Sequence, residues 1–193
     1  MPYRVSPPVA PIPAAPEAPA HLASPSPWRL RPAMLDDVPA LAALYANCAR
    51  TLGPGCYSPE QVAAWASFGD DLAGFADYVL GADTWVAVEA AGLGVDGLSG
   101  DPDGAAPLGF SGVDDSGEVK SLYVRPDMMR RGLAGQLLAQ GLGRAQVRGI
   151  QRIAAWATPF SLPVFLRAGF MLVERVRAEF AGAMFERIRV RRG

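Results

Sequence analysis

The sequence predicts an α/β fold of the α+β type, in which a mixed, largely antiparallel central sheet is flanked by helices. Three observations predict it. Apolar residues make up 50% of the 193 residues, which is enough for one sizeable core. Segments with helical spacing alternate with short strand-like segments. The sequence contains no internal repeat, which favours a single domain of this kind. The predicted order of elements is β-α-α-α-β-β-β-α-β-α-β-β.

The N-terminal segment differs in composition from the rest of the chain. Residues 1–27 are rich in proline, alanine and serine, so many backbone donors are missing and no helix interior or central strand fits. We expect a tail there, either extended and disordered or docked on a partner subunit. The folded domain is expected over residues 28–193.

The first half of the domain predicts one strand and three helices. Residues 28–31 form the strand. Acidic residues 36–37 suit the positive N-terminus of a helix, which the Gly-Pro-Gly run at 53–55 ends. The run Ser58-Pro59-Glu60-Gln61 is a capping box that begins the second helix. A third helix is expected over residues 70–80.

The second half predicts strands, a Gly/Asp-rich loop and two further helices. The expected elements are a strand at 84–89, a loop at 91–105, a hairpin of strands 107–113 and 118–124, a helix at 132–148, a strand at 153–157, a helix at 162–168 and strands at 170–177 and 183–190. Arginines alternate with apolar residues over 187–192, which predicts an edge strand with a solvated face.

Charge and composition exclude several classes of protein. The net charge of −1 and pI of about 5.8 give no basic surface for nucleic acid. No run of about 18 apolar residues exists to span a membrane, and prolines interrupt the N-terminus where a signal peptide would be apolar. We therefore expect a cytoplasmic protein. A single histidine, His21, and two cysteines, Cys48 and Cys56, predict neither a metal site nor a disulfide framework.

The strongest local signal is the turn at residues 129–135. A strand stops near Pro126, and a turn of small residues then leads directly into a helix. Such a turn directs several free backbone N–H groups to one place, at the positive end of the helix. Gly132, Ala134 and Gly135 would let a phosphate approach the backbone closely, and Arg130 and Arg131 would add positive charge. The pattern fits a diphosphate site, although a tightly packed strand-turn-helix without a ligand also fits.

This turn resembles motif A of the GNAT acetyltransferases, whose signature is Gln/Arg-x-x-Gly-x-Gly/Ala. Gly132 and Ala134 match the glycine and the Gly/Ala position, whereas Met129 departs from the Gln/Arg. The resemblance implies that acetyl-CoA is the cofactor, with its diphosphate bound along residues 130–135, Leu133 included.

Other segments between Trp28 and Val190 also resemble this family. Gly109-Phe110 is similar to a Gly-Phe pair common in its third strand. Residues 157–170 resemble motif B, which implies cofactor contacts for Thr158 and Phe165. The stretch that contains Tyr57, Gln61 and Trp65 resembles the substrate-side helices of bacterial YafP-like members, which implies acceptor binding, although a buried aromatic stripe is the alternative.

The family resemblance also implies a mechanism of direct acetyl transfer to an amine. Leu122, Tyr123 and Val124 are expected along the pantetheine arm, with the Val124 N–H as the carbonyl donor. Glu118 resembles in position the glutamate that serves as base in one branch, although a solvated strand-end glutamate fits equally well. The usual acid tyrosine falls on Phe165, which leaves water, Thr158, Ser161 or Tyr123 as proton donors.

Three functions remain in consideration. The first is an acetyl-CoA-dependent N-acetyltransferase acting on a primary amine of a small molecule or protein, without nucleic acid, membrane or metal. The sequence leaves the oligomeric state open, and a homodimer is an assembly common in the family that it resembles. The second is a catalytically silent acyl-CoA-binding sensor or regulatory module, which Phe165 and Met129 favour. The third, an unrelated nucleotide-binding protein sharing only the turn, agrees less well with the motif B match.

Overall fold

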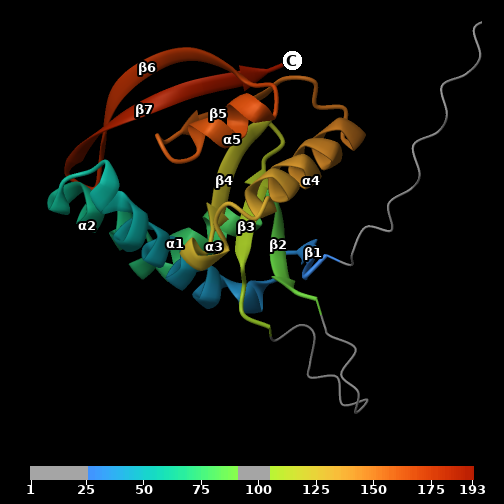
Figure 1. The fold of residues 1–193 in the computed structure, drawn as a ribbon, viewed down its shortest axis with the longest axis horizontal. Helices are drawn as coiled ribbons and strands as arrows, with labels where there is room; N and C mark the ends of the chain where they lie inside the picture. The colour runs from blue at the N-terminus through green and yellow to red at the C-terminus, as the bar shows by residue number, and fades with distance from the viewer. Residues whose placement is uncertain (1–25, 91–104) are drawn as a thin grey trace, which may run out of the picture.

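A computed structural model describes residues 26–90 and 105–193 of the chain (Figure 1). The predicted tail at 1–27 and the loop at 91–105 lie almost entirely outside the described residues. The strands are β1 (Trp28–Pro32), β2 (Asp83–Glu89), β3 (Gly109–Val113), β4 (Glu118–Val124), β5 (Ile153–Ala157), β6 (Met171–Phe180) and β7 (Ala183–Arg192). The helices are α1 (Val38–Leu52), α2 (Pro59–Ser67), α3 (Leu72–Leu80), α4 (Leu133–Val147) and α5 (Leu162–Arg167).

The seven strands form one mixed sheet in the order β1-β2-β3-β4-β5-β7-β6. Strands β4 and β5 are parallel, and every other neighbouring pair is antiparallel. The predicted order of elements and the mixed sheet are therefore confirmed. The prediction that residues 187–192 form an edge strand is wrong, because β7 lies between β5 and β6 and leaves β6 at the edge.

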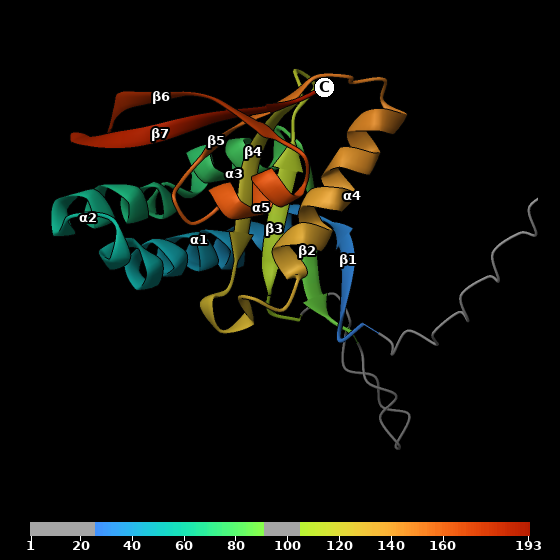
Figure 2. The same ribbon diagram turned by 45° about the horizontal axis from the view of Figure 1, so that its top comes forward.

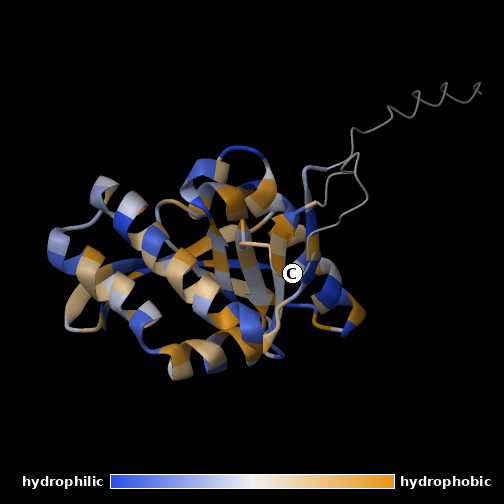
Figure 3. Cartoon of the chain, turned by 90° about the horizontal axis from the view of Figure 1, so that it is seen from below, coloured by the Kyte–Doolittle hydropathy of each residue, from blue (hydrophilic) through white to orange (hydrophobic). Residues whose placement is uncertain are grey.

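Helices cover both faces of the sheet (Figures 1 and 2). Helices α1, α2 and α3 pack on one face around an aromatic and aliphatic cluster that includes Leu41, Phe75 and Phe110. Helices α4 and α5 pack on the other face, where Leu138 and Phe165 meet the inner residues of β5 and β7. The hydropathy colouring in Figure 3 shows apolar strands enclosed between these helices.

Local sequence explains where α2 begins. The Ser58 hydroxyl accepts from the Gln61 N–H, and the Gln61 side chain accepts in return from the Ser58 N–H at 2.8 Å. Pro59 occupies the first helical position, where no intrahelical N–H is needed. The predicted capping box is thus formed, and it orients α2 toward the β6–β7 hairpin.

The sheet opens in its middle, between β4 and β5. The two strands pair only through Glu118 with Ala154 and Val119 with Ala155. Beyond these pairs they diverge, and the register of β4 against β3 shifts at Lys120, which is an extra residue in β4. The remainder of β4, up to Val124, therefore has a partner strand on its β3 side alone.

Candidate active site

A cleft of about 1240 Å³ occupies the opening between β4 and β5. Its walls come from β4, the turn before α4, the α4 helix, β5 and α5. Most of the predicted cofactor residues line it: Leu122, Tyr123, Val124, Arg130, Gly132, Leu133, Ala134, Gly135, Thr158 and Phe165. The structure thus brings together two motifs that lie about 30 residues apart in the sequence.

The backbone of β4 presents polar groups to this cleft. The Arg125 N–H donates to the Leu108 carbonyl at 2.8 Å, which makes Val124 and Gly109 a non-hydrogen-bonded pair in the antiparallel ladder. The N–H and C=O of Val124 therefore point away from β3. The same alternation turns the backbone of Leu122 toward the cleft, since Leu122 lies two residues earlier on the strand.

The turn before α4 is shaped to leave backbone donors free. Arg130 has φ 59 and Gly132 has φ 89, so two residues of the turn adopt the left-handed conformation. Gly132 is the N-cap residue of α4, and no side chain caps the first helical N–H groups. A Cβ placed on Gly132 or Gly135 would meet nothing within 4 Å. The turn is therefore open and positively polarised, as an anion site would require.

The side chains of this turn serve different purposes. Arg130 lines the cleft, whereas Arg131 is exposed and lies outside the cleft lining. Leu133 is buried in an apolar cluster with Leu137, so only its backbone is available at the turn. Met129 lines the cleft where the motif A signature has Gln or Arg. The backbone of the turn therefore provides most of its polar groups.

Helix α1 contributes a thiol that the sequence did not single out as functional. The Cys48 Sγ donates to the Val124 carbonyl at 3.3 Å, and this side chain is 2% exposed. Burial raises the pKa of Cys48 to about 12, against a smaller lowering effect of that hydrogen bond. Cys48 is therefore a neutral thiol that holds the backbone of β4, and an apolar helix face gave no signal for this role.

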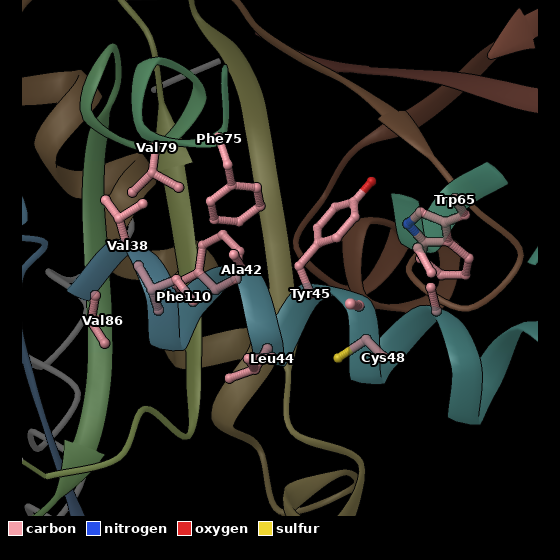
Figure 4. Packing of buried hydrophobic residues seen from close by; sticks show 14 of the residues in the cluster. Val38, Ala42, Leu44, Tyr45, Cys48, Trp65, Phe75, Val79, Val86 and Phe110 are labelled. Atoms are coloured by element: carbon pink, nitrogen blue, oxygen red, sulfur yellow. The ribbon is translucent and has the colours of Figure 1, made fainter. Parts of the chain in front are cut away.

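Aromatic residues form the wall of the cleft on the α1 side. The rings of Tyr45 and Tyr123 have centroids 4.7 Å apart, and Trp65 lies 6.5 Å from Tyr45 and 6.4 Å from Tyr123. Figure 4 shows the polar atoms of Tyr45 and Trp65 directed toward each other. Burial raises the pKa of Tyr123 to about 12, and hydrogen bonds to Trp65 and Tyr45 partly oppose that rise. These hydroxyls stay protonated at neutral pH.

The residues of motif B form the opposite wall. Thr158 and Ser161 bond to each other, with the Thr158 N–H donating to the Ser161 Oγ at 3.0 Å, and so fix the turn between β5 and α5. Phe165 is buried and packs edge-to-face on Phe170, with ring centroids 5.1 Å apart. Both Thr158 and Phe165 line the cleft, as expected, and the phenyl ring has no proton to donate.

Glu118 does not reach the end of the cleft at Val124. Its two carboxylate oxygens accept from Nη1 of Arg189 at 2.8 and 2.7 Å, and it is absent from the cleft lining. Glu118 and Val124 are six residues apart on β4, which is about 20 Å of extended strand. The expectation of Glu118 as a direct base is therefore corrected: its ion pair lies at the closed end of the opening between β4 and β5.

Of the three predicted acceptor residues, one lines the cleft and two lie behind it. Trp65 lines the cleft, but Tyr57 and Gln61 do not. Tyr57 packs edge-to-face on Trp65 and Phe185, with centroids 5.7 and 5.4 Å apart. The Gln61 Nε2 donates to the Met184 carbonyl, so Gln61 connects α2 to β7. Tyr57 and Gln61 thus support the wall behind Trp65 without entering the cleft.

Ser121 is a cleft residue that the sequence analysis missed. It is 4% exposed, and its Oγ has no hydrogen-bond partner among the described residues. The one signal in the sequence for this residue was a hydroxyl side chain beside the apolar residues at the end of β4. Within residues 26–90 and 105–193, no three His, Cys, Asp or Glu side chains gather into a metal site. No helix of these ranges has the length and apolar character needed to cross a bilayer.

Comparisons with known proteins agree with this geometry. A family profile described as "Acetyltransferase (GNAT) domain" matches residues 102–190. The uncharacterized N-acetyltransferase YafP of Escherichia coli is 27% identical over 150 residues, which are 77% of this chain and 85% of YafP.

Solved structures show the same fold. A GCN5-related N-acetyltransferase from Rhodopseudomonas palustris is 26% identical, with a TM-score of 0.72 over 84% of this chain and 93% of that one. PaiA N-acetyltransferase from Thermoplasma acidophilum, solved in complex with coenzyme A, is 12% identical, with a TM-score of 0.64 over 85% and 97%. The opened sheet, the glycine turn and these similarities lead to one conclusion: residues 102–190 match a GNAT acetyltransferase domain, and the chain is an acetyl-CoA-dependent N-acetyltransferase similar to YafP.

Proposed function

We propose that the chain transfers an acetyl group from acetyl-CoA directly to a primary amine of a small molecule or protein. The observation that carries the proposal is the pair of N–H groups of Leu122 and Val124 that have no strand partner and face a cleft that ends at the uncapped N-terminus of α4. Similar folds accept this ligand: PaiA was solved with coenzyme A, and YncA from Salmonella typhimurium, 17% identical with a TM-score of 0.59, with acetyl-CoA.

The residues present fit the cofactor in each of its parts. The free N–H groups after Gly132, together with Arg130, would bind the diphosphate. Leu122 and Val124 would pair with the amides of the pantetheine arm as a neighbouring strand does. Tyr123, Thr158 and Phe165 would form the walls around it.

The Val124 N–H is placed to polarise the acetyl carbonyl. When the amine nitrogen attacks the carbonyl carbon, a C–N bond forms and negative charge collects on the oxygen, where a fixed backbone donor stabilises it. The C–S bond then breaks, and its electron pair leaves on the thiolate. Cys48 holds the Val124 carbonyl, so the donor on the same residue is kept in position before reaction.

Solvent would accept the protons that the acceptor nitrogen loses and supply the proton that the thiolate gains. No Asp, Glu or His lines the cleft among the described residues, so the acceptor's ammonium group would lose one proton to water before the nitrogen attacks and a second one as the amide forms. Tyr123 has a pKa of about 12 and holds its proton more tightly than a thiol with an ordinary pKa of about 8.5. Proton transfer from Tyr123 to the departing thiolate would therefore be uphill, and the thiolate would leave as the anion and be protonated by the buffer.

Titration calorimetry with acetyl-CoA tests the cofactor site. Gly135→Glu places bulk and negative charge at the turn, and its helical backbone tolerates a side chain, unlike that of Gly132. We expect micromolar binding to the wild type and at least a 100-fold loss in Gly135→Glu. Val147→Glu adds the same charge to the exposed last turn of α4, where 82% of the residue is exposed, and should bind normally. Equal binding by all three proteins would refute the assignment.

A silent acyl-CoA-binding module is the second candidate. It is favoured by the cleft itself, which lacks an Asp, Glu or His to act as a base and has Phe165 in place of an acid. Release of free thiol from acetyl-CoA in the presence of a broad amine panel separates the two functions. Turnover supports the enzyme, whereas tight acetyl-CoA binding without turnover on any amine supports the module.

A further inference from the structure

A basic cluster lies on the α1–α3 side of the sheet, where β4 and β5 still pair. We define it as Lys120, Arg187 and Arg189. The guanidinium groups of Arg187 and Arg189 lie 5.2 and 5.0 Å from the ring centroid of Trp156, and Trp156 is the direct strand partner of Arg189. The cluster is therefore built on an aromatic platform, which limits the freedom of both arginines.

Only one of these three cations is neutralised. Glu118 binds Arg189 through both of its oxygens. Across residues 26–90 and 105–193, neither Lys120 nor Arg187 forms an ion pair. The Lys120 ammonium lies 6.0 Å from the ring of Tyr78, whose hydroxyl donates to the Lys120 carbonyl. Burial raises the pKa of Tyr78, and the positive charge of Arg187 opposes that rise. Arg187 and Lys120 are therefore both near the ring of Tyr78.

The cluster adjoins the cleft described above. Lys120, Ser121 and Trp156 all line it, together with Val124. Ser121 brings a buried hydroxyl with no partner in the described structure, and a buried polar atom of this kind calls for a ligand or water. Lys120 and the unpartnered hydroxyl of Ser121 thus follow one another on β4 near its paired end, and Arg187 approaches from β7 over the ring of Trp156.

We propose that the acceptor amine also carries an anionic group, a carboxylate or a phosphate, which Lys120 and Arg187 bind beside Trp156. The inference rests on the proposed acetyl transfer at Val124. Lys120 and Val124 are four residues apart, or about 13 Å of strand, so the amine and the anion are separated by several bonds. Longer ω-amino acids fit this spacing better than α-amino acids do.

Calorimetry on protein saturated with coenzyme A tests the inference without requiring turnover. The probes are 4-aminobutyrate and 6-aminohexanoate, each against its neutral amide, and O-phosphoethanolamine against ethanolamine. We expect each anionic probe to bind at least tenfold more tightly than its neutral counterpart, with the carboxylate and phosphate pairs showing which anion is preferred.

Three variants connect that preference to the cluster. Arg187→Gln and Lys120→Gln should each weaken the anionic probes about tenfold and leave the neutral probes unchanged. Glu118→Gln frees Arg189 and should strengthen binding of the anionic probes. Arg177→Gln is the matched control, because Arg177 is exposed on the adjoining strand and Val176, its neighbour, is the residue opposite Arg187. It should bind every probe like the wild type.

The outcomes separate this inference from the proposed function. If the wild type binds acetyl-CoA but anionic and neutral probes bind equally, or no anionic probe binds, the inference is wrong and the cofactor site stands. If Arg187→Gln or Lys120→Gln weakens coenzyme A instead, the cluster belongs to the cofactor and the inference is also wrong. Absence of acetyl-CoA binding to the wild type would refute the proposed function itself.

Discussion

In the proposed mechanism, Val124 acts through its backbone. Its N–H faces the cleft because the register with β3 directs it there, and its carbonyl is held by the thiol of Cys48. A side-chain substitution would leave both groups in place. Proline is the informative change, since it removes the N–H from a position that makes no ladder hydrogen bond with β3.

Val124→Pro should therefore lower kcat about 100-fold to 1000-fold, the usual effect of removing one oxyanion donor. Val124→Ala loses the same apolar contacts but keeps the donor, and its kcat should stay within a few-fold of the wild type. Single-turnover rates with saturating acetyl-CoA make the comparison, and a thermal melt confirms that both variants fold. A proline variant as fast as the alanine variant would exclude the Val124 donor.

Glu118 is the residue for which sequence position and structural environment disagree. Because Arg189 holds its carboxylate about 20 Å of strand from Val124, Glu118→Gln should keep kcat/KM for a neutral amine within about threefold. Loss of the ion pair should lower the free energy of unfolding by about 1 kcal/mol. The pH dependence of the rate gives the opposing test. If Glu118 were the base, Glu118→Gln would lower the rate about 100-fold and would abolish the fall in rate at acidic pH.

At the scale of elements, the side chain of Gln61 connects α2 to the β6–β7 hairpin by a hydrogen bond. Gln61 accepts from the Ser58 N–H and donates to the Met184 carbonyl, so it caps the helix and connects it to β7. Gln61→Ala should lower the free energy of unfolding by about 1–2 kcal/mol in urea denaturation. Glu60→Ala, which loses a contact to Ser58 alone, should cost less. If Gln61→Ala instead raised the KM for the acceptor and left stability unchanged, Gln61 would be a residue that binds the acceptor.

The elements that the sequence predicted well are those with local signals. The capping box at Ser58 and the small-residue turn at 129–135 depend on neighbouring residues, and both were found where expected. Strands β6 and β7 extend two to three residues beyond the predicted ends. Hairpin length depends on cross-strand pairing, which a single strand does not reveal.

The sequence could not predict which strands are neighbours in the sheet. Alternating arginines at 187–192 predicted two chemically different faces, but not that β7 lies inside the sheet. Their charge is accommodated there by contacts from elsewhere, including Glu118, 71 residues away, and Trp156. The misplaced base followed from the same limit, since the partner of Glu118 comes from the last strand.

At the scale of the whole molecule, buried acids should make stability fall in alkaline solution. Burial raises the pKa of Cys48 from 9.0 to about 12 and that of Tyr57 and Tyr123 from 10.0 to about 12. The unfolded chain releases these protons from about pH 9 to 10, whereas the folded protein retains them until about pH 12. Rising pH therefore favours unfolding across this window, by about 1.4 kcal/mol per pH unit for each group.

Urea denaturation at pH 8, 9.5 and 10.5 measures this slope. Cys48→Ser removes one titrating group while retaining a donor for the Val124 carbonyl, so its stability should fall less steeply above pH 9. A wild-type stability that stays constant from pH 8 to 10.5 would contradict the burial of these groups.

The divergence of β4 from β5 has a consequence for amide hydrogens and solvent deuterium. In the protein alone, the amides of Leu122 and Val124 lack a strand partner and should exchange quickly, whereas those of Tyr123 and Arg125, which face β3, should exchange slowly. Acetyl-CoA lying along β4 would complete the sheet as an eighth, non-peptide strand. Its binding should therefore slow the exchange of alternate residues, and so remove the fast–slow pattern along β4.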